Sequence, residues 1–74
     1  MSNDVYVEKL NFVKNELAAC LRAATDGGVV RLDYSYEPGH GEIVTIYFEN
    51  GSRRKVNVDA DSHLAIIQDV LRMI

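Results

Sequence analysis

Several residue types are scarce in this chain of 74 residues, and each scarcity excludes a class of structure. The only cysteine is Cys20, so no disulfide can form within the chain, and a single cysteine fits a reducing compartment better than a secreted setting. The two histidines, His40 and His63, do not combine with Cys20 into a recognised metal-ligand spacing. We therefore expect a domain without a disulfide, a bound metal or a cofactor.

Long apolar runs and an excess of positive charge are also missing. No run approaches the roughly 20 apolar residues that a membrane span needs, and no basic segment followed by an apolar one begins the chain. We therefore expect a cytoplasmic protein without a membrane anchor. The net charge of −3 argues against nucleic acid as the partner, because phosphate binding is driven by Lys and Arg.

What is present is the composition of one globular domain covering residues 1–74. The apolar fraction is 47% and the charged fraction 26%, both ordinary for such a domain. A core of this size supplies only about 3–5 kcal/mol of net stability, so small domains often depend on a partner.

Residues 4–25 show the three- and four-residue spacing of an amphipathic helix. The stripe consists of Tyr6, Leu10, Val13, Leu17, Leu21 and Ala24. Cys20 lies at its edge, where we expect a buried packing residue. Gly27 is the expected left-handed end of the helix. Asp26-Gly27-Gly28 follows a helix and precedes a strand, the reverse of the order that a phosphate-binding loop needs.

The spacing then changes to alternation, which predicts strands over residues 29–36, 42–49 and 52–58. The apolar face comprises Val30, Leu32, Tyr34, Tyr36, Val44, Ile46, Phe48, Val56 and Val58. The opposite face comprises Arg31, Asp33, Ser35, Thr45, Tyr47, Arg53, Lys55 and Asn57.

The register of the strands follows from parity. Val44 and Val56 share a face only if the loop at Asn50-Gly51 has an odd number of residues, because a shift of one residue reverses every side chain. We therefore predict a three-residue loop with a bulge and a left-handed Gly51. By the same parity, the turn at Pro38 should have three or five residues.

The last segment predicts a second helix that begins after Asp59 or Asp61, both good N-caps, and continues to residue 74. Its main stripe is Ala60, Leu64, Ile67, Leu71 and Ile74, and Ile66, Val70 and Met73 widen it. Short loops make the strands an antiparallel meander, and both helices must cover its apolar face. We expect a two-layer α+β domain of order α-β-β-β-α.

This element order resembles the double-stranded RNA-binding domain over nearly the whole chain. Pro38-Gly39-His40, before a strand that ends in Tyr47-Phe48, is similar to the Gly-Pro-x-His turn of that family, with Pro and Gly reversed. The family binds phosphates with a Lys-Lys cluster at the start of its last helix. Here the corresponding positions are Asp59, Asp61, Ser62 and His63, so the resemblance covers the order of elements and not the binding motif.

Catalytic residues would have to lie close together in a pocket. Cys20 is expected in the core, His40 in a solvated turn and His63 in the first turn of the last helix, and no pair of acids is placed for glycosidase chemistry. A two-layer domain with a flat sheet also has little room for a deep pocket. We expect that the protein is not an enzyme.

Two surfaces remain as candidates for docking. Apolar residues beyond the needs of the core predict a protein interface, made of Val5, Phe12, Ile66, Val70 and Met73. The open sheet face predicts a second surface, made of Arg31, Tyr47, Arg53 and Lys55. We therefore predict a non-catalytic interaction or regulatory module that forms a homodimer or binds a protein partner. RNA binding through the sheet face is the alternative.

Overall fold

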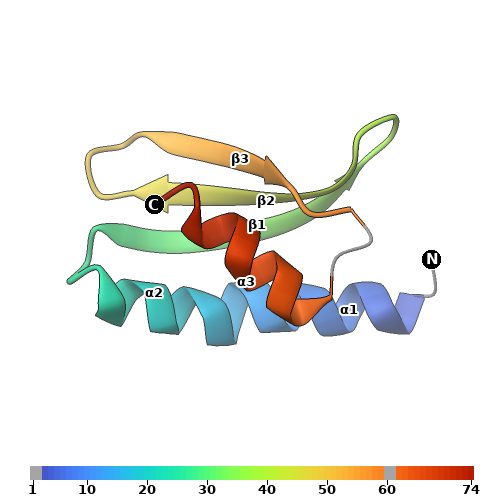
Figure 1. The fold of residues 1–74 in the computed structure, drawn as a ribbon, viewed down its shortest axis with the longest axis horizontal. Coiled ribbons are helices and arrows are strands. Elements are labelled where there is room, and N and C mark those ends of the chain that lie inside the picture. The colour runs from blue at the N-terminus through green and yellow to red at the C-terminus, as the bar shows by residue number, and fades with distance from the viewer. Residues whose placement is uncertain (1–2, 60–61) are drawn as a thin grey trace.

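The computed structural model describes residues 3–59 and 62–74 and confirms the predicted α+β fold (Figure 1). One long N-terminal helix runs along the sheet, and a shorter C-terminal helix crosses the same side of the sheet obliquely. The elements are α1 (Asn3–Asn11), the π-helical segment η1 (Phe12–Leu17), α2 (Ala18–Ala24), β1 (Val29–Glu37), β2 (Gly41–Phe48), β3 (Arg53–Asn57) and α3 (His63–Leu71).

The long helix is continuous from α1 through η1 to α2, as its apolar spacing predicts. The π-helical turn in its middle was not predicted. Its i→i+5 hydrogen bonds rotate the faces of the residues that follow it. Ala18 is therefore buried beside Leu17 and Leu21, whereas Cys20 is exposed. The prediction of a buried Cys20 was wrong because it assumed an uninterrupted α-helical period.

The helix ends at a turn that also starts the sheet. Gly27 has a φ of 85°, as predicted for a left-handed end, and its N–H donates to the carbonyl of Arg22 at 2.9 Å. The hydroxyl of Thr25 donates to the carbonyl of Leu21 at 2.6 Å and accepts from the N–H of Val29 at 2.9 Å. One side chain thus links the last helical turn to the first residue of β1.

The strands pair in the order β1-β2-β3, all antiparallel. Val44 pairs with Val56, and the N–H of Phe48 donates to the carbonyl of Ser52, which leaves a loop of three residues. Gly51 in this loop has a φ of 86°. The register and the loop predicted from parity are both confirmed, and so is a three-residue turn over residues 38–40.

A bulge in β1 changes which valine enters the core. The register with β2 shifts between Val29 and Arg31, so Val30 has no partner across the ladder. Val29 is fully buried, and Val30 is 40% exposed. The prediction that Val30 faces inward was wrong, because an extra residue in one strand reverses the faces that precede it.

The helix α3 is capped by Ser62, whose Oγ accepts from the N–H of Ala65 at 3.2 Å. Asp59 was the wrong choice of cap, and Asp61 and Ala60 lie outside the described residues. The buried face of α3 also differs from the predicted stripe. Ile66 and Val70 are fully buried, whereas Leu64, Leu71 and Ile74 are 64%, 52% and 47% exposed.

The core lies between the sheet and the two helices. Its buried members are Val13, Leu17, Ala18, Leu21, Val29, Leu32, Tyr34, Val44, Ile46, Val58, Ile66 and Val70. All three strands or their ends contribute, together with both helices, so the helices and the sheet bury each other as two layers.

Candidate functional site

The open face of the sheet carries a cross-strand row of three side chains. Arg31 pairs with Tyr47, and Tyr47 pairs with Arg53, so the two arginines flank one tyrosine. The guanidinium carbon of Arg31 lies 4.0 Å from the centroid of the Tyr47 ring, a cation–π contact. Lys55 pairs with Thr45 in the neighbouring row. The structure therefore brings the four predicted sheet-face residues together.

The acids on this face lie beside lysines. Glu37 Oε1 is 3.3 Å from the ammonium of Lys55, and Asp33 Oδ1 is 4.0 Å from the ammonium of Lys14. Within residues 3–59 and 62–74, neither Arg31 nor Arg53 takes part in an ion pair. The guanidinium groups are thus the cations of this surface that remain available to an anion.

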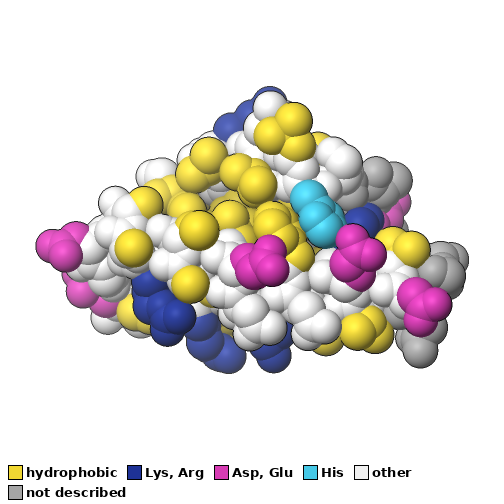
Figure 2. Space-filling view, turned by 90° about the horizontal axis from the view of Figure 1, so that it is seen from below, with side chains coloured by type: hydrophobic (Ala, Val, Ile, Leu, Met, Phe, Trp, Pro, Cys, Tyr) yellow, Lys and Arg dark blue, Asp and Glu magenta, His cyan; other side chains and the backbone are white. Residues whose placement is uncertain are grey.

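The helix side of the molecule presents apolar residues to solvent. Figure 2 shows hydrophobic side chains gathered near the middle of this side, with acidic side chains beside them. On α3 and the turn after it, Leu64, Leu71 and Ile74 are exposed and follow one another at seven- and three-residue steps. The seven-residue step places Leu64 and Leu71 on one side of α3, and we call these two residues together with Ile74 the α3 stripe.

The predicted protein interface is only partly accessible. Ile66 and Val70 are fully buried, so these two residues belong to the core and not to an outward surface. Met73 and Phe12 are half-buried and pack against the core. Val5 is 43% exposed. The correction for Ile66 and Val70 has a simple cause: α3 is apolar over half its circumference, and the spacing alone does not say which half faces the sheet.

Phe12, which was predicted to belong to the protein interface, packs against the core instead. Its ring stacks on the imidazole of His63, with centroids 4.4 Å apart and planes within 2° of parallel. His63 Nε2 also lies 3.4 Å from Glu8 Oε1. These contacts attach the start of α3 to the long helix, so Phe12 and His63 hold the two helices together.

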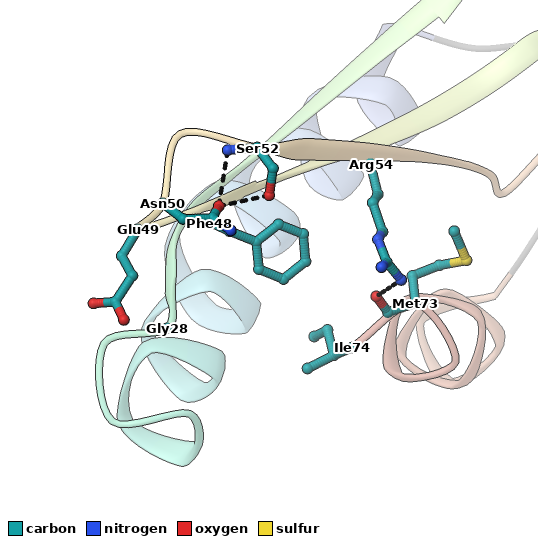
Figure 3. A pocket seen from close by; sticks show the side chains of 8 residues that line it. All are labelled: Gly28, Phe48, Glu49, Asn50, Ser52, Arg54, Met73 and Ile74. Carbon is teal, nitrogen blue, oxygen red and sulfur yellow. Dashed lines mark hydrogen bonds between the residues drawn. The ribbon is translucent and has the colours of Figure 1, made fainter.

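A pocket of about 320 Å³ opens between the β2–β3 loop and the end of α3 (Figure 3). Its apolar lining comes from Phe48, Met73 and Ile74, and Arg54 lies at one wall. Arg54 Nη1 donates to the carbonyl of Met73 at 3.1 Å and thereby binds the C-terminal turn of α3 to β3. The pocket continues from the α3 stripe, because Ile74 belongs to both.

The sequence predictions missed a buried charged cluster beneath α1. Glu42 is 1% exposed and faces the core, and the ammonium of Lys9 lies 3.0 Å from its Oε1. The hydroxyl of Tyr34 donates to the same carboxylate oxygen. Burial, the hydrogen bond and the nearby negative charge all raise the pKa of Tyr34 well above its usual range. The signal was present, because Glu42 shares the inward parity of Val44 and Ile46.

The remaining polar candidates show no shared site. His40 is exposed in its turn, where its carbonyl accepts from Asn57 Nδ2 at 2.6 Å. Among the described residues, no group of three or more Cys, His, Asp or Glu is placed to hold a metal ion. In the same part of the chain, no helix combines the length and the apolar character that crossing a membrane would require.

Comparisons with protein-family models, with curated proteins and with solved structures gave no match to this chain. The function is therefore inferred from the surfaces of the molecule itself.

Proposed function

We propose that the protein is a non-catalytic interaction module that pairs with a second copy of itself through the α3 stripe. The observation that carries the proposal is the exposure of Leu64, Leu71 and Ile74, three large apolar side chains of α3 and the turn that follows it. Apolar side chains that cluster on a surface, rather than occurring singly, mark sites of protein interaction.

The charges around the stripe are compatible with a symmetric pair. Gln68, between Leu64 and Leu71, is uncharged. The charged residues of the last turns are one acid and one base, Asp69 and Arg72, which lie 3.4 Å apart at their Oδ1 and Nη1 atoms. Asp69 and Arg72 have opposite signs, so this pair adds no net charge to a twofold contact between two stripes.

The pocket beside the stripe extends the same surface. Because Ile74 lines the pocket and is also part of the stripe, a partner helix on the stripe can place a side chain against Phe48. Large side chains that enter pockets near the centre of an interface contribute most of its binding energy. The single cysteine favours a reducing, cytoplasmic setting for this module.

The test is the solution mass of wild type, Leu64→Asp and Leu71→Asp by size-exclusion chromatography with light scattering, over a series of protein concentrations. We expect a dimer for the wild type and monomers for both variants. Their urea midpoints should stay close to the wild-type value, because both leucines are more than half exposed.

The matched control is Val7→Asp, which also introduces a carboxylate at an exposed apolar helix position, 44% exposed, but on α1. It should remain a dimer. A wild type that is monomeric at every concentration, or a dimer that survives both leucine substitutions, would overturn the proposal.

RNA binding through the open sheet face is the second candidate. It is supported by the arginines and the lysine on that face. Binding of single-stranded RNA, compared with binding of an acidic peptide of the same length, tests it.

A further inference from the structure

We propose that the row Arg31–Tyr47–Arg53 on the open sheet face is a binding site for an acidic, extended segment of a partner protein. This site is independent of the α3 stripe, because its side chains lie on the side of the sheet that faces away from both helices. Its success or failure can therefore be separated from that of the dimer.

The first support is the chemistry of the two cations. Arginine presents a planar set of donors that matches a carboxylate with two parallel hydrogen bonds. The carboxylates of this face already have lysines beside them, Glu37 beside Lys55 and Asp33 beside Lys14 of the long helix. Arg31 and Arg53 have no carboxylate beside them in the described residues, so they are the groups that a partner's acids would reach.

The second support is the spacing of the row. Arg31 and Arg53 lie on the two outer strands with Tyr47 between them, so their backbones are about 10 Å apart, two strand separations. Alternate side chains of an extended peptide lie about 7 Å apart. Two acids at alternate positions can therefore each meet one of these long, flexible arginines.

The third support is the role of Tyr47, which distinguishes an acidic peptide from a nucleic acid. Proteins that bind single strands on a sheet stack successive bases on several aromatic rings. Here one aromatic side chain lies in the row, and the guanidinium of Arg31 already covers one face of its ring at 4.0 Å. The ring holds Arg31 in place instead of offering a platform for bases.

Tyrosine and arginine are also the residues that dominate the energetics of protein interfaces. Tyr47 is half-buried between its neighbours, so it is ordered before a partner arrives. An ordered ring that orients an arginine lowers the entropy lost on binding.

The experiment is fluorescence anisotropy with a labelled peptide in which Glu alternates with Ser, using the full chain at low salt. We expect saturable binding that weakens as salt is added and that is absent for the same peptide with Gln in place of Glu. The double variant Arg31→Gln/Arg53→Gln should lose at least tenfold in affinity, and Arg31→Lys/Arg53→Lys should lose less, since charge is kept and the planar fork is lost.

The matched control is Arg22→Gln, which removes one exposed positive charge from α2 and should change affinity less than twofold. Circular dichroism of each variant shows whether the fold is intact. The proposal is overturned if the Glu peptide does not bind, if its affinity is unchanged in the double Gln variant, or if single-stranded RNA of the same length binds more tightly. The last result would establish the nucleic-acid alternative in its place.

Discussion

The ammonium group of Lys9 lies 3.0 Å from Glu42 Oε1 and 3.3 Å from Oε2, and so joins the helix α1 to the strand β2. The Lys9 side chain is 12% exposed and that of Glu42 is 1% exposed. Removing one partner of such a pair leaves a buried charge without compensation, which costs far more than the pair itself contributes.

We expect Lys9→Met to lower the free energy of unfolding by about 3 kcal/mol, which is most of the net stability of a domain of this size. The double variant Lys9→Met/Glu42→Gln should recover at least half of that loss, since the buried charge is then gone and an acceptor for Tyr34 remains. Urea denaturation followed by circular dichroism measures both. Lys14→Met, at a lysine that is 49% exposed, is the control and should cost less than about 0.5 kcal/mol. A double variant no more stable than Lys9→Met would contradict this account.

The tyrosine beside this pair predicts a loss of stability in alkaline solution. The raised pKa of Tyr34 means that the folded protein keeps this proton where the unfolded chain, with a usual pKa near 10, releases it. The folded form then binds more protons, so its stability is present below about pH 10 and falls as the pH rises further. We expect the urea midpoint of the wild type to decline as the pH rises above 10. The midpoint of Tyr34→Phe should decline less steeply with pH. Each slope also contains contributions that do not involve Tyr34, so the difference between the two slopes is the decisive quantity. Equal slopes would show that Tyr34 does not contribute.

Two glycines of one turn offer a matched pair of substitutions. Gly39 and Gly41 have φ values of 85° and 89°, so alanine is strained at both. A Cβ on Gly39 would meet nothing within 4 Å, whereas a Cβ on Gly41 would lie 2.5 Å from Asp59 Cγ. We expect Gly39→Ala to cost about 1 kcal/mol, from backbone strain alone, and Gly41→Ala about 2–4 kcal/mol, because the clash adds to the strain. Urea midpoints measure both, and equal costs would mean that the Asp59 side chain moves aside without penalty.

Phe12 is predicted to matter for stability more than for association. Because its ring packs on the core and stacks on His63, Phe12→Asp should lower the free energy of unfolding by about 2 kcal/mol, less than the 3–5 kcal/mol of a fully buried phenylalanine. We expect faster amide hydrogen exchange across α3 in this variant, since the contact that attaches the start of α3 is lost. Protection of α3 that stays at the wild-type level would show that Phe12 does not hold this helix.

The sheet was predicted more completely from sequence than the helices, for a physical reason. Alternation has a period of two, so a pair such as Val44 and Val56 constrains both the register and the parity of the loop between them. A helix that is apolar over half its circumference has no such constraint. For α3, Ile66 and Leu64 are equally good core residues by spacing, and the contact with the sheet decides between them.

The candidate sites also differ in how far the sequence predicts them. The row of Arg31, Tyr47 and Arg53 follows from strand alternation and register, both readable from sequence. The partners of Glu42 cannot be predicted from alternation and register. Lys9 lies 33 residues away in the chain and approaches Glu42 only because α1 packs on the sheet. The π-helical turn is a further feature without a local signal, and it explains why Ala18 is buried while Cys20, predicted to be buried, is exposed.

The two three-residue loops of the sheet have a consequence for how the chain assembles. Each strand pairs only with its neighbour in sequence, so the meander closes two very short loops and loses little loop entropy in doing so. Isolated β-hairpins form within microseconds, and both turns of this sheet are of the hairpin kind. The contact of Lys9 with Glu42 joins residues that are 33 apart in the chain, so closing it costs more loop entropy than either turn of the sheet.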